Sequence, residues 1–318
     1  MSNHIFLIIL IIVILILSGV IFTLICCGKI AKIVYRETLV RTSPDKWSRC
    51  CQAPENEEHL LMWNRGLEFA KAHSDLMHEV MVENDGLKLY GEYYDFGYDK
   101  AAIIVPGRTE SLMYSYYFAI PYYKAHCNIL VIDLRAHGKS DGMYDVDPGE
   151  SDDLLLWISL LQEQFGMKDI ILHGICIGAG TCIQILSGQN PPSCVRAFIS
   201  EGGYVSFPES YRQHMRQLHR PVYPIMPMVM HLIKQHTGCD VYKTRPIDFI
   251  DKVHVPTLFL CGMKDLSSLP EKSQQLFDKC GAAQKELVWF EEGAHSHLRI
   301  ANEDKYDNAV ISFLEKIL

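Results

Sequence analysis

Short apolar segments, each ending at a glycine or an aspartate, recur from about residue 78 onward and restrict the fold more than any other feature of the sequence. They include AAIIVPG, NILVIDLRAHG, DIILHG, VRAFISEGG, TLFLCGMKD and KELVWFEEG, and stretches of helical character lie between them. Such nearly continuous apolar runs are typical of parallel strands that helices cover on both faces. The alternation predicts an α/β fold over residues 78–318, with a mostly parallel sheet.

The first two strands of this unit are expected to pair in the opposite sense. HEVMVEN and LKLYGEYYDF flank Asp85-Gly86, a dipeptide that favours a tight hairpin turn. An antiparallel hairpin should therefore open the sheet. In sheets of this kind ligands bind at the carboxyl ends of the strands, so the residues that follow each strand are the candidates for chemistry.

One long interval interrupts the alternation. Residues from Tyr204 to about Lys243 contain no convincing strand but include ESYRQHMRQLHR and PIMPMVMHLIKQH. An ordinary crossover helix would explain this interval. We favour a helical cap inserted at about 204–243, because long insertions in compact domains usually carry function. The methionine side chains of such a cap are expected to face a hydrophobic substrate.

The N-terminal segment has a different composition from the rest of the chain. Ile5 to Cys26 is a run of 22 residues without a charge. As a helix it would span about 33 Å, enough to cross the hydrocarbon core of a bilayer. A cleaved signal peptide is the alternative, but the run is longer than a usual signal core and no basic residue precedes it. We expect a transmembrane anchor over residues 1–28, followed by a helical stem over 29–77.

The charges around this segment predict its orientation. Lys29, Lys32, Arg36 and Arg41 follow the run, and the positive-inside rule places basic flanks in the cytoplasm. The 11 cysteines are odd in number, and no N-x-S/T sequon occurs. The expectation is a single-pass membrane protein whose large domain is cytoplasmic.

Composition argues against several partners. The formal net charge is −8, and no basic stripe with interleaved aromatic residues follows the N-terminal region, so we expect no nucleic-acid partner. No C-x-x-C or H-E-x-x-H spacing indicates a metal. No G-x-G-x-x-G follows a strand, so no cofactor is expected.

The segment ILHGICIGAG has the strand–turn–helix context of a nucleophile elbow, G-x-S-x-G, but Cys176 occupies the serine position. A cysteine there would begin a helix, where free N–H groups and the helix dipole stabilise a thiolate. The backbone N–H of Ile177 would face the same space and donate to an oxyanion.

Four segments in fixed order resemble the α/β-hydrolase family from about His78 to the C-terminus. They are VPGRTES at the turn after the third strand, DLRAHGKSDG, the acid-bearing PIDFIDKVHVPTLFLCGMKDLSSLP, and EEGAHSH near the end. The resemblance implies an eight-stranded sheet with a small cap. It also implies Cys176 as nucleophile, Asp265 as orienting acid and His295 as base, with a second oxyanion donor at the N–H of Arg108. His297 is expected to lie outside this triad.

A cysteine nucleophile changes the chemistry that the resemblance implies. The thioacyl intermediate resembles that of dienelactone hydrolases, which also use Cys, Asp and His, and a thiol suits thioesters and strained lactones. Three functions remain open: a membrane-anchored hydrolase of acyl substrates, small or lipid-like; an acyltransferase with the same intermediate; and a non-catalytic binding protein. We favour the hydrolase because all three triad residues are present.

Overall fold

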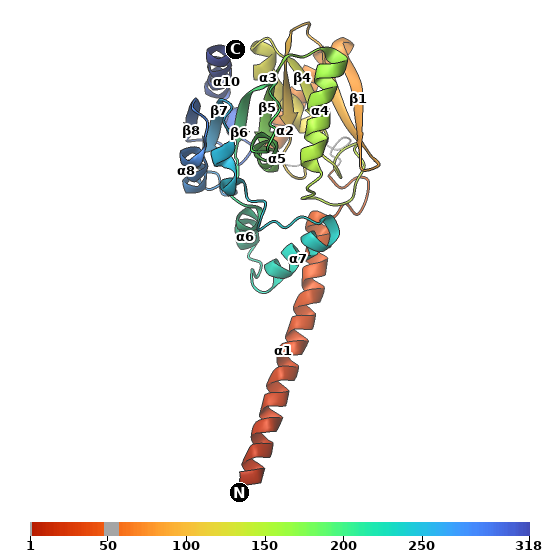
Figure 1. The fold of residues 1–318 in the computed structure, drawn as a ribbon, viewed down its shortest axis with the longest axis vertical. Helices are drawn as coiled ribbons and strands as arrows, with labels where there is room; N and C mark the ends of the chain where they lie inside the picture. Colours follow the sequence, from red (N-terminus) through yellow and green to blue (C-terminus); the bar gives the residue numbers. More distant parts are fainter. Residues whose placement is uncertain (1, 48–56) are drawn as a thin grey trace.

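An eight-stranded sheet organises the chain, with the strands in the order β1-β2-β4-β3-β5-β6-β7-β8 (Figure 1). The computed structural model describes residues 2–47 and 57–318, so residues 48–56 of the expected stem lie outside the described residues. The strands are β1 Met77–Asn84, β2 Leu87–Tyr94, β3 Lys100–Val105, β4 Asn128–Ile132, β5 Asp169–Ile175, β6 Val195–Glu201, β7 Thr257–Gly262 and β8 Lys285–Phe290. The helices are α1 Ser2–Leu39, α2 Glu57–Ala72, α3 Leu112–Lys124, α4 Glu150–Phe165, α5 Ile177–Leu186, α6 Phe207–Gln217, α7 Ile225–Thr237, α8 Pro270–Lys279, α9 Leu298–Ala301 and α10 Glu303–Ile317, with short 3-10 turns at Ser74–Leu76, Pro246–Asp248 and Ile250–Lys252.

The pairing confirms the predicted mostly parallel sheet. Strands β3 to β8 run parallel to one another, whereas β2 runs antiparallel to both β1 and β4. Asp85 and Gly86 form the hairpin turn between β1 and β2, with φ of 53° and 75°. Positive φ at both central residues is the geometry that lets a two-residue turn match the twist of its strands.

Helices cover both faces of the sheet, as the apolar strands require. Along β5, Ile170 and Leu172 belong to the core on one face, and Ile171 and Ile175 to the core on the other, because successive strand residues point in opposite directions. Helices α4, α5 and α8 contribute to the first core, and α2, α3 and α10 to the second. The carboxyl ends of the six parallel strands thus meet at one edge.

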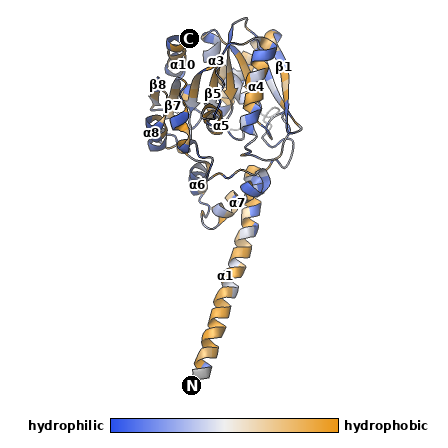
Figure 2. Cartoon of the chain, in the orientation of Figure 1, coloured by the Kyte–Doolittle hydropathy of each residue, from blue (hydrophilic) through white to orange (hydrophobic). Residues whose placement is uncertain are grey.

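Helix α1 passes from an exposed environment into the domain without a break. Residues 4–25 are exposed, and this outer part projects away from the sheet as an apolar rod (Figures 1 and 2). Ala31, Tyr35 and Leu39 are spaced four apart on one helix face, and all three are buried. The boundary predicted at residue 28, between anchor and stem, therefore falls inside one continuous helix.

The interval between β6 and β7 contains α6 and α7, which lie beside the inner end of α1 (Figure 1). We refer to residues 204–243 as the cap segment. Helix α7 packs against α1, and Met226 and Met230 are buried in the core that also holds the inner end of α1. The Tyr35 ring stacks on His236 of α7, with ring centroids 5.3 Å apart.

The residues that follow α1 bind it to the sheet domain. The Arg41 guanidinium donates to the carbonyls of Gly138 and Ser140 at 2.7 and 2.8 Å. The backbone N–H of Asp145 donates to the Leu39 carbonyl, one of the last carbonyls of the helix. Such carbonyls have no partner inside their own helix. The end of α1 is thus a structural part of the domain.

Candidate active site

Cys176 occupies a strained turn between β5 and α5. Its φ of 52° and ψ of −112° are rarely adopted by a residue with a side chain, and the conformation lifts the side chain out of the sheet edge. The flanking glycines are needed for space. A Cβ on Gly174 would lie 2.5 Å from the Ala179 Cα, and one on Gly178 would lie 2.3 Å from the Val105 carbonyl oxygen. Close packing of the turn therefore fixes where the thiol stands.

His295 and Asp265 meet at the same edge of the sheet, in the loops after β8 and β7. The His295 Nδ1 lies 2.7 Å from Oδ2 of Asp265. The other oxygen, Oδ1, accepts the backbone N–H groups of Ser267 and Ser268 at 2.8 and 2.7 Å. Asp265 is buried, and these hydrogen bonds hold both of its carboxylate oxygens in place. This arrangement fixes the orientation of the imidazole ring.

Cys176 contacts the same imidazole ring that Asp265 orients. Burial opposes a charge on the ring, but the charges of Cys176 and Asp265 and hydrogen bonds to both outweigh it. The pKa of His295 therefore lies well above its ordinary value of 6.5. These interactions favour the protonated imidazolium form of His295. The three residues predicted for the triad thus lie together, in the order thiol, imidazole and carboxylate.

Two backbone groups named from the sequence lie beside the thiol. Ile177 is the first residue of α5, so its N–H has no acceptor within the helix. The turn after β3 passes close by, because a Cβ on Gly107 would lie 3.6 Å from the Cys176 Cβ. Arg108 and Ile177 line the same pocket as Cys176 and His295.

This triad pocket has a volume of about 170 Å³. The cap segment lines it with Phe207, Tyr211 and His214 of α6. The expectation that cap methionines face the substrate is wrong: among the described residues no methionine lines this pocket, because Met226 and Met230 turn into the core against α1. Burial and the charge of Arg108 lower the pKa of His214, which favours its neutral form.

The inner end of α1 contributes a contact to this pocket that the sequence did not reveal. The Arg108 guanidinium donates to the Thr38 carbonyl of α1 at 2.8 Å and pairs with Asp145 at 3.1 Å. The Thr38 hydroxyl lies 2.9 Å from the hydroxyl of Tyr211. Residues 38 and 108 are far apart in the chain, and no local pattern links a helix end to a turn after a strand.

Other polar residues at the carboxyl ends of the strands have structural roles. The Nδ1 of His297 is 2.7 Å from a Glu58 carboxylate oxygen, so this ring is paired with α2. Asp133 accepts the N–H groups of Leu112 and Lys139, and burial raises its pKa to about 7. Its contacts hold the turn after β4. Among the described residues, no group of three or more His, Cys, Asp or Glu side chains is arranged to hold a metal ion.

Comparison with known proteins agrees with this architecture. The sequence model of the α/β-hydrolase fold matches residues 101–237. The esterase Pf2001 of Pyrococcus furiosus superposes with a TM-score of 0.63 at 20% identity, over 78% of this chain and 95% of that one. The α/β hydrolase GrgF of a Penicillium species superposes with a TM-score of 0.61 at 18% identity, over 76% and 98% of the two chains.

A more similar sequence comes from a bacterium. The uncharacterized protein YqkD of Bacillus subtilis is 27% identical over 219 residues, which cover 68% of this chain and 71% of that protein. The strand order, the family match and the structural neighbours lead to one conclusion: the chain has the α/β-hydrolase fold.

Proposed function

We propose that this protein is a membrane-anchored hydrolase that cleaves an ester, thioester or related acyl bond with Cys176, His295 and Asp265. The observation that carries the proposal is the placement of a thiol on the strained elbow, beside an imidazole that a buried carboxylate holds at 2.7 Å. Nucleophile, acid and histidine follow one another along the chain in the order used by α/β hydrolases. An exposed cysteine without these partners would support no such reaction.

In the first half of the reaction the Cys176 thiolate attacks the carbonyl carbon of the substrate. The electron pair of the C=O bond moves to the oxygen, and the backbone N–H groups of Ile177 and Arg108 donate to that oxyanion. When the intermediate collapses, the bond to the leaving group breaks. The His295 imidazolium gives its proton to the leaving oxygen or sulfur, and a thioester on Cys176 remains.

In the second half a water molecule attacks the thioester. His295, now neutral, accepts a proton from this water, while the same two N–H groups bind the new oxyanion. Collapse breaks the C–S bond and releases a carboxylic acid and the Cys176 thiolate. In both halves Asp265 orients the ring and stabilises the imidazolium.

The nucleophile favours activated carbonyl substrates. A thiolate leaves a tetrahedral intermediate more readily than an alkoxide does, so an intermediate formed from an ordinary ester tends to revert to substrate. Thioesters and strained lactones have leaving groups good enough to compete. We propose such bonds, in small or lipid-like acyl compounds, as the substrate class.

The proposed anchor is the outer part of α1. Among the described helices, α1 is long and apolar enough to cross a membrane, with a mean hydropathy of 3.6 in its most apolar window. The basic residues Lys29, Lys32 and Arg36 follow directly. We propose that the sheet domain lies on the cytoplasmic side, as basic flanks favour.

The test uses the full chain in detergent micelles with acyl thioesters and p-nitrophenyl esters of increasing chain length. We expect Cys176→Ala to abolish turnover and His295→Ala to reduce kcat by at least about 100-fold. Cys182→Ala is the matched control, because Cys182 lies on α5, six residues after Cys176, and is buried. Its activity should remain close to that of the wild type.

A second measurement separates the alternatives. Iodoacetamide should alkylate Cys176 faster than the half-buried Cys26 and Cys27, and His295→Ala should slow this reaction. Product that forms only when an alcohol or amine acceptor is added would favour an acyltransferase. Equal labelling of all three cysteines, without turnover of any substrate, would indicate a protein that binds but does not catalyse.

A further inference from the structure

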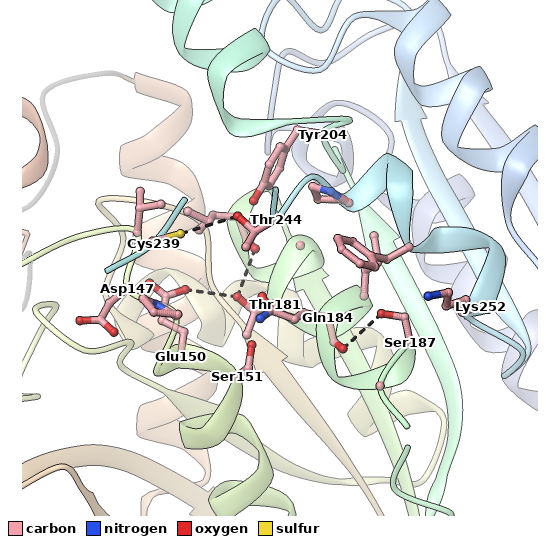
Figure 3. A pocket seen from close by; sticks show the side chains of 18 of the residues that line it. Asp147, Glu150, Ser151, Thr181, Gln184, Ser187, Tyr204, Cys239, Thr244 and Lys252 are labelled. Atoms are coloured by element: carbon pink, nitrogen blue, oxygen red, sulfur yellow. Dashed lines mark hydrogen bonds between the residues drawn. The ribbon is translucent and has the colours of Figure 1, made fainter. Parts of the chain in front are cut away.

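A second cavity lies along α5, and Figure 3 shows the side chains that line it. Its volume of about 290 Å³ exceeds that of the triad pocket. We call it the elbow cavity. Its walls come from the segment leading into α4, from α5 and from residues 239–252. Ile177 and Tyr204 line both cavities, so they form a shared wall. The proposed reaction leaves this cavity unused.

The elbow cavity contains a buried carboxyl group with an unused hydrogen-bonding atom. Glu150, at the start of α4, is only 6% exposed. Its Oε2 accepts a hydrogen bond from the Thr181 hydroxyl at 3.2 Å. Its Oε1 is buried and has no hydrogen-bond partner within residues 2–47 and 57–318. A buried polar atom without a hydrogen-bond partner destabilises the folded state by about 1–3 kcal/mol. We therefore expect a ligand that donates a hydrogen bond to Oε1 of Glu150.

The surroundings of Glu150 are acidic. Burial and the charges of Asp145 and Asp147 together raise the pKa of Glu150 to about 8, although the charge of Arg135 opposes them. The Arg135 guanidinium already forms ion pairs with Asp147 and Asp153, at 2.8 and 2.6 Å, so it is not a partner for Oε1 of Glu150.

The other polar groups at this end supply no positive charge. The cap segment contributes Cys239 and Tyr204 to the cavity wall, and α5 contributes Thr181, whose hydroxyl bonds to Glu150. The one lysine among the cavity-lining residues, Lys252, lies at the opposite end (Figure 3). The Glu150 end of the cavity is thus suited to a cation.

We propose that the elbow cavity binds an organic ammonium compound with a small apolar body, whose ammonium group donates to Oε1 of Glu150. An ammonium group carries three donors and no acceptor, which matches an acidic wall. Hydrogen bonds between charged partners are about twice as strong as neutral ones, so a carboxylate prefers an ammonium to an alcohol. Ile183, Pro246 and Phe249 provide the apolar surface for the rest of the ligand.

Binding of the ammonium compound should release a proton from Glu150, and this release can be measured. At pH 7 the free cavity holds Glu150 mainly protonated, since its pKa is about 8. When the ammonium binds, Glu150 ionises and the proton passes to the buffer. The ligand keeps its own proton, so one positive charge enters and one proton leaves. A neutral ligand of the same shape would release none.

The probe is 2-phenylethylamine, with 2-phenylethanol as its uncharged counterpart, titrated calorimetrically into the full chain in micelles at pH 7. The Cys176→Ala background removes any turnover, so the outcome does not depend on the proposed function. We expect the amine to bind at least about tenfold more tightly than the alcohol, a difference of about 1.4 kcal/mol. Titration in phosphate and in MOPS, which differ in ionisation enthalpy, should show release of close to one proton per amine bound.

Two variants complete the test. Glu150→Gln keeps the side-chain volume and should lose both the preference for the amine and the proton release. Glu163→Gln is the matched control, because Glu163 is an exposed residue of the same helix, and it should keep both within about twofold. Equal affinity for amine and alcohol, no proton release, or unchanged amine binding in Glu150→Gln would each overturn the proposal.

A cooperative unfolding transition verifies that Glu150→Gln is folded, and the pH dependence of that transition in the two proteins tests the titration of Glu150. Glu150 keeps its proton up to about pH 8 in the folded chain, whereas the unfolded acid loses it near 4.5. The folded state therefore binds more protons between these values, and the stability contributed by Glu150 falls as the pH rises through this window. Glu150→Gln should remove that part of the slope.

Discussion

The two ends of helix α1 have the same secondary structure but opposite surroundings. Residues 4–25 expose an apolar surface on every side, which in water would be unfavourable. Ala31, Tyr35 and Leu39 bury a single face against the sheet domain and α7, while Lys32 and Arg36 stay exposed between them. The outer part is therefore suited to a lipid environment, and the inner part to a protein core.

This difference shows that the proposed anchor is not a detachable tether. A flexible linker would let the domain rotate freely beneath a membrane, but a continuous helix transmits its direction to the domain. The inner end also contacts the triad pocket, since the Thr38 carbonyl accepts a hydrogen bond from Arg108. One continuous helix thus joins the proposed anchor to a residue of the triad pocket.

Two truncations that end on either side of this boundary should give the largest difference. Removal of residues 2–27 leaves the inner part intact, so we expect a folded domain that hydrolyses soluble thioesters at close to the full rate. Removal of residues 2–40 takes away Tyr35 and Leu39, whose burial contributes about 3–6 kcal/mol. That is a large share of the usual 5–15 kcal/mol of domain stability. Gel filtration, circular dichroism and activity measurements distinguish the outcomes.

The longer truncation should aggregate or lose at least about 100-fold in activity. If both truncated proteins were equally folded and active, the inner end of α1 would be a mere extension of the anchor. If both failed, the outer part would be required for folding as well.

Single substitutions should reproduce the contrast on a smaller scale. Leu39 is fully buried, so Leu39→Ala should lower the free energy of unfolding by about 2–5 kcal/mol. Leu15 is 65% exposed in the outer part, so Leu15→Ala is the matched control and should leave that free energy unchanged. Chemical denaturation of the full chain in micelles measures both. Equal effects would contradict the division of α1 into two environments.

Much of the fold could be predicted from the sequence because the relevant signals are local. Apolar strands ending at Gly or Asp predicted the parallel sheet, and Asp85-Gly86 predicted the hairpin turn that positive φ confirms. The elbow was predictable for the same reason: Gly174 and Gly178 stand where a Cβ would collide with the backbone. The structure brings Cys176, His295 and Asp265 together, and their catalytic roles stay a prediction.

Features that depend on contacts between distant segments could not be predicted. Tyr35 and Leu39 continue an apolar helix, so hydropathy alone gave no sign that they enter the domain core. The methionines of α7 matched a substrate-facing cap by composition, yet they pack against α1. Glu150 resembles an ordinary acid in the first turn of a helix. Its burial results from the packing of α4 against α5, which no local pattern records.

Arg108 allows a test of the link between α1 and the site. Its guanidinium joins the helix carbonyl of Thr38 to Asp145, whereas only its backbone N–H is proposed to touch the oxyanion. Arg108→Met removes the link but keeps the N–H, so the turn after β3 becomes less fixed. We expect kcat to fall about tenfold, equivalent to about 1.4 kcal/mol, with little change in KM. Arg108→Lys should restore part of the rate. A rise in KM at constant kcat would instead indicate that the side chain binds substrate.

The hydroxyl pair between Thr38 and Tyr211 should have the smallest effect. Thr38 Oγ1 donates to the Val34 carbonyl at 2.7 Å, so the Tyr211 hydroxyl, 2.9 Å away, is the donor to Thr38. Thr38→Val and Tyr211→Phe each remove one partner while keeping the shape. We expect each to reduce stability by about 0.5–1.5 kcal/mol. The double variant should lose less than the sum, because the two substitutions remove one shared bond. If the losses of stability in the two single variants simply add in the double variant, the cap segment and α1 are coupled by apolar packing alone. Arg108 would then provide the polar link between α1 and the triad pocket.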